Sequence, residues 1–108
     1  MNDIHIAAAD ILIDLEAALR DLQLWQLDLP PAEALASTAP FAVDTLTFTQ
    51  WLQFMFLPQM QLLIDERAPL PVNCAIAPMA DEYFKPQVVD GSAVVVQLQR
   101  IDTLLSHQ

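Results

Sequence analysis

The chain has 108 residues, 55% of them hydrophobic, and carries fourteen acidic against four basic side chains, a formal net charge of −10. Nucleic-acid affinity comes largely from Lys and Arg that neutralise phosphates, so this balance argues against direct RNA or DNA binding. An acidic membrane surface would repel the chain as well. The acidic surface therefore either keeps an apolar protein soluble or meets a basic protein partner.

The length suits one domain spanning residues 1–108. A single cysteine, Cys74, excludes an internal disulfide and is typical of a reducing compartment. The first residues lack the basic start of a signal peptide. No apolar run approaches the ~18 residues of a membrane span. These features predict a cytoplasmic protein.

Residues 4–25 show a heptad pattern that predicts a long amphipathic helix. Its apolar stripe, with steps of four and three, comprises Ile4, Ala8, Ile11, Leu15, Ala18, Leu22 and Trp25. We expect this helix to pack inside a bundle. Four acids lie away from the stripe and form the candidate partner-facing surface: Asp3, Asp10, Asp14 and Asp21.

The stretch 47–67 predicts the central helix of the fold. Its apolar residues cover nearly every direction around the helix axis, which is typical of a buried helix. Thr47 and Gln50 have the spacing of a capping box at its start. Pro58 lacks a backbone donor inside the helix, so we expect a kink there.

Prolines separate the central helix from its neighbours. Pro30 and Pro31 end the first helix, after which residues 32–35 can form one turn and residues 37–40 are predicted as a loop. Beyond the central helix, residues 68–77 are expected to be extended and to run back along it. A short helix is then predicted over residues 78–85, with a proline at its first position.

The last segment combines two opposing signals. The dipeptide Asp90-Gly91 between valines indicates a β-hairpin. Against this, Val94, Leu98, Ile101 and Leu105 repeat at helical spacing. A lone two-stranded hairpin on an otherwise helical chain would be poorly stabilised. We therefore predict a helix over residues 92–106.

The usual signatures of catalysis are weak in this sequence. Cys74 would need a base to act as a nucleophile, and the only histidines, His5 and His107, lie at the ends of the chain. Two distant histidines do not predict a metal site. The only glycine leaves no phosphate-binding loop. We therefore predict no catalytic residue, no cofactor and no metal, and favour a non-enzyme.

Six residues around the central helix are the candidate interaction or pocket residues. Aromatic residues and Met are over-represented in partner grooves, although helical spacing also suits a plain core. A pocket between the central helix and residues 70–78, lined by Trp51 and Phe54 with Asp44 or Asn73 at its mouth, would hold a small molecule. The six are Asp44, Thr45, Trp51, Phe54, Met55 and Asn73.

The excess of apolar residues also predicts self-association. Val94, Val95 and Val96 cannot all lie on one face of a helix. If part of this run stays uncovered in the monomer, a two-fold homodimer would bury it.

Several short motifs, in order along the chain, resemble the signature of the YqcC-like family. They are Pro40-Phe41, Asp44-Thr45-Leu46, Gln50-Trp51-Leu52-Gln53-Phe54, Leu57-Pro58-Gln59-Met60, Leu70-Pro71 and Ile76-Ala77-Pro78-Met79-Ala80. The resemblance covers most of the chain and is specific in its middle third. It implies a small cytoplasmic protein of proteobacteria that folds as an all-α bundle of about four helices. It brings no established activity, but it implies an association with tRNA pseudouridine synthase C.

Synthases of that class carry a catalytic Asp in an Arg-Leu-Asp motif, followed by Thr-Ser-Gly. The sequence Arg100-Ile101-Asp102-Thr103 imitates only the first part, and no glycine follows. We therefore interpret Asp102 as a solvated side chain without a catalytic role. The leading hypothesis is a non-enzymatic bundle that acts through protein contacts, as an accessory to an RNA-modifying enzyme. The alternatives are a participant in tRNA pseudouridylation and, more weakly supported, a small-molecule binder.

Overall fold

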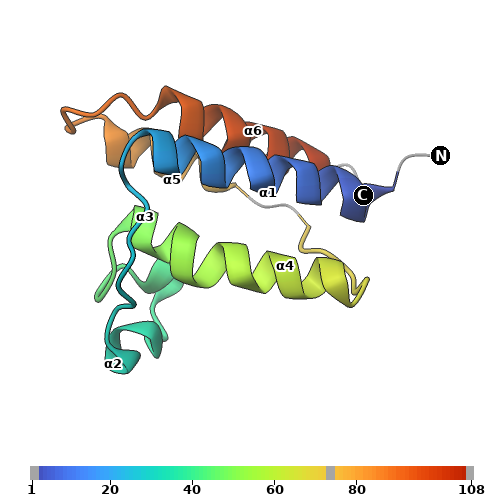
Figure 1. Ribbon diagram of the computed structural model, residues 1–108, viewed down its shortest axis with the longest axis horizontal. Helices are drawn as coiled ribbons and strands as arrows, with labels where there is room; N and C mark the ends of the chain where they lie inside the picture. The colour runs from blue at the N-terminus through green and yellow to red at the C-terminus, as the bar shows by residue number, and fades with distance from the viewer. Residues whose placement is uncertain (1–2, 73–74, 107–108) are drawn as a thin grey trace.

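The computed structural model describes residues 3–72 and 75–106, and this described part contains helices but no strand (Figure 1). A 3-10 turn, η1 (Pro40–Ala42), precedes α3, and a π turn, η2 (Leu52–Phe56), joins α3 to α4. The α-helices are α1 (Ile4–Asp21), α2 (Ala32–Leu35), α3 (Phe48–Trp51), α4 (Leu57–Asp65), α5 (Ile76–Phe84) and α6 (Ser92–Ser106). The all-α prediction is confirmed, and so is the choice of a helix over a hairpin for residues 92–106.

The long elements form a bundle within the described residues. Helices α1 and α6 lie side by side in opposite directions, and α5 packs against α6 (Figure 1). The element from α3 through η2 to α4 lies across from them and contacts α1. The predicted bundle of about four helices is therefore confirmed, and α2 lies at its edge. None of the described helices combines the length and the apolar character needed to cross a membrane.

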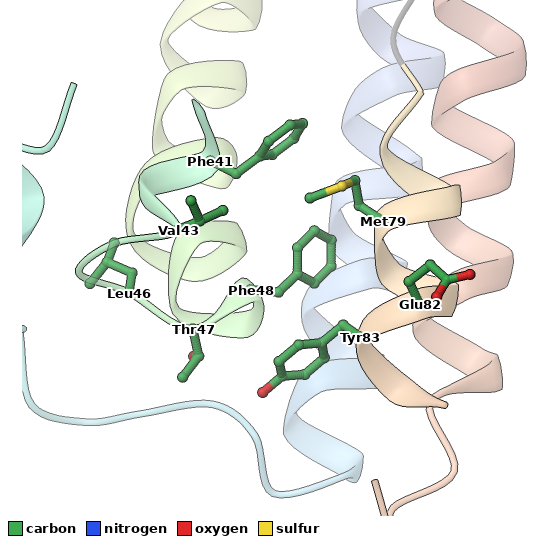
Figure 2. A pocket seen from close by; sticks show the side chains of 8 residues that line it. All are labelled: Phe41, Val43, Leu46, Thr47, Phe48, Met79, Glu82 and Tyr83. Atoms are coloured by element: carbon green, nitrogen blue, oxygen red, sulfur yellow. The ribbon is translucent and has the colours of Figure 1, made fainter. Parts of the chain in front are cut away.

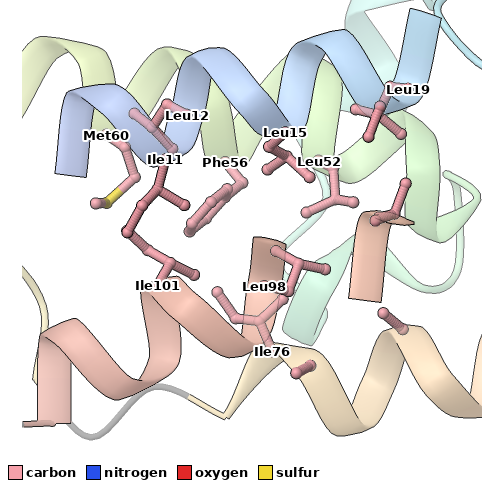
Figure 3. Close-up of a cluster of buried hydrophobic side chains, with 14 of the residues drawn as sticks. Ile11, Leu12, Leu15, Leu19, Leu52, Phe56, Met60, Ile76, Leu98 and Ile101 are labelled. Atoms are coloured by element: carbon pink, nitrogen blue, oxygen red, sulfur yellow. The ribbon is translucent and has the colours of Figure 1, made fainter. Parts of the chain in front are cut away.

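The core lies where the apolar faces of these elements meet (Figure 3). The predicted stripe of α1 is buried from Ala8 to Leu19. On α6, Val94, Leu98, Ile101 and Leu105 are each 0% exposed, so the helical spacing of these residues gives one buried face. Full burial of such a side chain contributes about 1.5–3 kcal/mol. The packing of the buried faces of α1 and α6 fixes where the other segments lie.

Helix α1 ends at Asp21, four residues before the predicted end at Trp25. Gln23 adopts a left-handed conformation with φ 60°. Its N–H donates to the carbonyl of Arg20 at 3.0 Å, and the N–H of Leu24 donates to the carbonyl of Leu19 at 2.9 Å. This is a Schellman motif, which normally places glycine at the position of Gln23. The apolar heptad spacing of the sequence extends past the end of helix α1, because Trp25 still packs against the core.

Replacing Gln23 with glycine should stabilise the protein by about 0.5 kcal/mol, because it removes the cost of a side chain in the left-handed region. The control is Ala17→Gly, which places glycine at an exposed position inside the helix and should destabilise by ~1 kcal/mol. Urea unfolding measures both changes. Destabilisation by Gln23→Gly as large as that by Ala17→Gly would contradict the motif.

Pro58 is accommodated by the π turn η2, which ends two residues before it. Trp51, Leu52, Phe56 and Leu57 all keep right-handed helical angles, and the N–H of Leu57 donates to the carbonyl of Leu52. A π turn adds one residue to a single helical turn. That extra residue relieves the crowding expected between the proline ring and the preceding turn. The sequence predicts a kink at Pro58, whereas the structure has a π turn from Leu52 to Phe56, and α4 continues through the proline.

The segment after α4 returns towards α5 past the start of α1 (Figure 1). Nε2 of His5 lies 2.7 Å from the carbonyl oxygen of Ala68, and Leu70 is buried in the core. Helix α5 begins at Ile76, two residues before the predicted start at Pro78.

The connection after α1 is fixed by one buried amide. Gln53 is 7% exposed, although it lies in the middle of the apolar central element. Its side-chain oxygen accepts from the backbone N–H of Gln26 at 2.8 Å, and its amide nitrogen donates to the carbonyl of Gln26 at 2.7 Å. The buried amide is thus hydrogen-bonded on both sides, as burial requires.

Candidate functional site

An apolar groove lies between the segment that leads into α3 and helix α5 (Figure 2). Its volume is about 420 Å³, within the roughly 300–1,000 Å³ typical of ligand pockets. The eight residues that form this α5 groove are Phe41, Val43, Leu46, Thr47, Phe48, Met79, Glu82 and Tyr83. Val43 is 62% exposed, so the groove presents apolar surface to solvent.

Aromatic contacts hold the two walls of the α5 groove together. The ring centroids of Phe48 and Tyr83, which lie on opposite walls, are 5.8 Å apart. Trp51 packs against Phe41 at 4.8 Å and against Phe48 at 6.0 Å. Such pairs contribute ~0.5–1.5 kcal/mol each beyond their burial. The walls are therefore formed before any ligand arrives.

The backbone of the first wall is strained. Phe41 and Ala42 have φ values of 56° and 49°, and neither is a glycine. Each such residue costs ~1–2 kcal/mol. The carbonyl of Ala42 accepts from the N–H of Leu46 at 2.8 Å, which fixes the turn in front of α3. Strain of this kind concentrates at functional sites, and here it sets the Phe41 ring against Trp51.

The start of α3 follows the predicted capping box. The Thr47 hydroxyl accepts from the N–H of Gln50 at 3.2 Å, and the Gln50 side chain accepts from the N–H of Thr47 at 2.8 Å. Because Thr47 also lines the α5 groove, the cap fixes one edge of the groove.

The edge of the groove on α5 is acidic. Glu82 is largely exposed and accepts from Nζ of Lys85 at 2.8 Å. This hydrogen bond, with the charges of Glu82 and Asp81, raises the pKa of Lys85. Lys85 is therefore protonated at neutral pH, and Asp81, which also attracts it, does not line the groove. This end of α5, with two carboxylates and one ammonium, keeps a net negative charge.

Of the six predicted pocket residues, three lie in α3 and η2 and a fourth comes later in the sequence. Trp51 is half-buried and supports the α5 groove from behind without lining it. Phe54 and Met55 are half-buried within η2. Asn73 lies outside the described residues.

The other two, Asp44 and Thr45, are exposed and stabilise the turn next to α2. Asp44 accepts a hydrogen bond from the hydroxyl of Ser37. The hydroxyl of Thr45 donates to the carbonyl of Ala34 at 2.7 Å. These contacts agree with turn chemistry, and neither residue lines the α5 groove. Three groove residues of the first wall, Phe41, Val43 and Leu46, lie between the predicted loop and the predicted central helix.

Two of the four candidate partner-facing acids are engaged within the chain. Asp3 caps α1 and accepts from Arg67 at 2.7 Å, and Asp14 accepts from Arg100 at 2.9 Å. The hydrogen bond from Arg67 is the main cause that lowers the pKa of Asp3. The stabilisation that it gives is therefore present at neutral pH and is lost as the pH falls through the lowered pKa. The two acids that remain exposed and outside the ion pairs on α1 are Asp10 and Asp21.

All four basic side chains of the chain form ion pairs with acidic residues. The remaining pair, besides those of Arg67, Arg100 and Lys85, joins Arg20 to Glu16 at 3.0 Å. The Arg20 guanidinium also lies over the ring of Trp25, 4.7 Å from its centroid. Each cation already faces a carboxylate, so none is positioned to bind a phosphate without giving up that contact.

Asp102 has a structural role that its position in the sequence did not indicate. Its two carboxylate oxygens accept from the backbone N–H groups of Ile76 at 3.0 Å and Ala77 at 2.8 Å. Helix α5 has Ala75 at its N-cap, which has no capping side chain. Asp102, on α6, supplies the missing cap. The interpretation of Asp102 as a solvated residue is therefore wrong, since it is half-buried and bonded to two backbone groups.

No group of His, Cys, Asp and Glu residues suited to a metal ion occurs within residues 3–72 and 75–106. Cys74 and His107 lie outside that part of the chain. His5 contacts the carbonyl of Ala68.

These features define a small, acidic, all-α bundle with an apolar groove on one side. A family model, DUF446, described as tRNA pseudouridine synthase C, matches residues 7–104, and the chain belongs to this family. The resemblance to YqcC-like proteins is confirmed. The solution NMR structure of protein YqcC from Escherichia coli has a TM-score of 0.84 and 32% identity, and the match covers 95% of this chain and 88% of that one.

Three sequence relatives extend this picture. The uncharacterized protein YqcC of E. coli is 34% identical over 92 residues, 85% of this chain and 84% of that protein. An uncharacterized protein of Haemophilus influenzae is 40% identical over 74 residues, 68% of this chain and 70% of that protein. A protein of Pectobacterium carotovorum named tRNA pseudouridine synthase C is 47% identical over 60 residues, 56% of this chain but only 16% of that protein.

Proposed function

We propose that this protein is a non-enzymatic accessory module that acts through protein contacts with a tRNA pseudouridine synthase of the C type. The Pectobacterium protein carries the proposal, because a region similar to this chain occupies 16% of a protein with that name. Two units joined in one polypeptide have a high effective concentration for each other. A separate chain of the same kind would achieve this proximity by binding.

The charge of the chain favours the enzyme over its tRNA as the direct partner. A tRNA-binding enzyme presents Lys and Arg to phosphates. This chain has a formal charge of −10, and each of its four cations is already paired. Opposite charges steer two proteins together, and added salt weakens that attraction. The proposal implies a protein that works in the cytoplasm.

The role of Asp102 also favours a non-enzymatic function. Its two oxygens accept the first N–H groups of α5, so a reaction at this carboxylate would remove the cap of that helix. The main alternative, direct participation in tRNA pseudouridylation, rests on the description of the family.

A pseudouridine assay separates the two functions. The purified protein alone should form no pseudouridine on tRNA and should not shift tRNA at physiological salt. The experiment includes Asp102→Asn, assayed at a temperature at which circular dichroism shows both proteins folded. Pseudouridine formation by the protein alone, lost in Asp102→Asn, would overturn the non-enzyme proposal.

Charge reversal at Asp10 and Asp21 should weaken the complex with the synthase. Both side chains are exposed on α1, so Asp10→Lys and Asp21→Lys replace attraction by repulsion without breaking an ion pair. We expect the dissociation constant to rise several-fold for each, chiefly through slower association at low salt. Titration calorimetry at two salt concentrations measures this. Asp28→Lys, an exposed acid on the loop after α1, is the matched control, and an equal loss there would show that only total charge matters.

Homodimer formation stays a prediction. Val94 is buried and Val95 packs against the core, so of the valine run only Val96, at 48% exposure, is left on the surface. Sedimentation equilibrium at tens of micromolar tests it: a 12.0 kDa species would contradict the dimer.

A further inference from the structure

We propose that the α5 groove binds a protein segment that carries one or two large apolar side chains flanked by Lys or Arg. This inference names the surface through which the proposed function would operate, and in that sense it rests on the proposed function. The geometry and the charge of the groove support it independently of that function.

The groove is apolar, open and preformed. Its walls carry Phe41, Val43, Phe48 and Met79, and the side chains of Phe41, Phe48 and Met79 extend into the gap between the walls (Figure 2). Val43 is exposed at 62%, while the aromatic contact between Phe48 and Tyr83 joins the walls. Aromatic residues and Met are characteristic of protein-binding surfaces. A side chain of the size of Leu or Phe would cover this apolar surface.

The backbone strain at Phe41 and Ala42 supports a binding role. Two consecutive residues other than glycine in the left-handed region are an expensive way to make a turn. A plain connection would place glycine or asparagine there. The strained turn positions Phe41 and Val43 on the groove. The strained residues therefore lie in the wall that contributes most of the groove residues.

The charge at the edge of the α5 groove determines which residues can stand beside the apolar side chain of a bound segment. Glu82 is the one acid that lines the groove, and it pairs with Lys85, whose ammonium is also attracted by Asp81. This end of α5 therefore holds two carboxylates and one ammonium, in a chain with a formal net charge of −10. A segment with acidic flanks, a phosphate or an anionic lipid would be repelled. A segment with Lys or Arg beside its apolar anchor would gain contacts with these carboxylates. Basic flanks are also expected on an enzyme that binds tRNA.

The test follows the amide signals of Val43, Thr47 and Tyr83 by NMR in the labelled full chain. The first probe is the purified tRNA pseudouridine synthase C of the same organism. The second is a set of short synthetic peptides: an apolar anchor with Lys flanks, the same anchor with Glu flanks, and Lys flanks with Ser in place of the anchor.

The variant for both probes is Val43→Gln, and its matched control is Val88→Gln. Val88 is a fully exposed valine outside the α5 groove. We expect the Lys-flanked anchor peptide to shift the groove amides, and the other two peptides to leave them unchanged. Val43→Gln should weaken binding of that peptide and of the synthase about tenfold, and Val88→Gln should leave both unchanged.

The outcomes separate the groove from the proposed function. If the synthase binds and Val43→Gln binds it as tightly as the unchanged protein, the groove proposal fails and the proposed function stands. If the synthase does not bind, the proposed function fails, and the peptides decide the groove. Equal shifts from Glu-flanked and Lys-flanked peptides, no shift from any peptide, or shifts that depend only on protein concentration and so assign the groove to a second copy, would each overturn the proposal.

Discussion

Replacing Asp102 with alanine should lower the free energy of unfolding by about 2–3 kcal/mol, because two half-buried N–H groups of α5 lose a charged acceptor. The bonds to Ile76 and Ala77 join α5 to α6 across a sequence separation of about 25 residues. The loss therefore affects the contact between two helices as well as the start of one. In a domain of this size it corresponds to a melting temperature lower by roughly 10 °C.

Two further substitutions identify the cause. Asp102→Asn keeps one oxygen acceptor and should lose about half as much, since asparagine is also a good N-cap residue. Thr103→Ala changes an exposed neighbour on the same helix and should leave the unfolding midpoint unchanged within ~0.5 kcal/mol. Urea unfolding followed by circular dichroism measures all three. A midpoint for Asp102→Ala equal to that of Thr103→Ala would contradict the capping role.

Replacing Gly91 with alanine should destabilise the protein by about 1–3 kcal/mol through overpacking. Gly91 is buried before α6, and a Cβ at this position would overlap the ring of Phe84. The backbone of Gly91 does not have a positive φ, so the requirement is for space and not for conformation. Phe84 cannot move freely because it is itself buried and packs edge-on against Tyr83, 5.1 Å between ring centroids.

The second substitution Phe84→Leu provides the test of this cause. It should be destabilising alone, but less so when combined with Gly91→Ala, because the smaller side chain leaves room for the new methyl group. Ala93→Ser, at an exposed position of α6, is the control. Thermal unfolding of the two single variants and the double variant gives the coupling energy. Strict additivity would show that Phe84 is not the residue that requires glycine.

The sequence predicted those helices whose apolar spacing is their main determinant. On α6, Val94 and Leu98 repeat at helical spacing and are both 0% exposed, so periodicity outweighed the hairpin signal of Asp90-Gly91. The same holds for α1 up to its Schellman motif. The position of Gln23 escaped prediction because glycine, the usual signal, is absent there.

The contacts that shape the candidate site were beyond prediction because they depend on residues distant in sequence or on unusual conformations. Asp102 caps a helix that begins at Ile76, and Gln53 bonds the backbone of Gln26. No local sequence pattern predicts hydrogen bonds between residues so far apart in the chain. The left-handed turn at Phe41 and Ala42 has no glycine or asparagine to mark it. The α5 groove follows from that turn, so it too required the structure.

Sedimentation velocity with the fluorescently labelled protein tests the central claim, that it acts on the enzyme and not on tRNA. The protein is mixed at physiological salt with the tRNA pseudouridine synthase C of the same organism, with tRNA, and with both. We expect it to sediment with the synthase in the first and third mixtures and as free protein in the second. Sedimentation with tRNA alone, or as free protein in the presence of the synthase, would contradict the proposal.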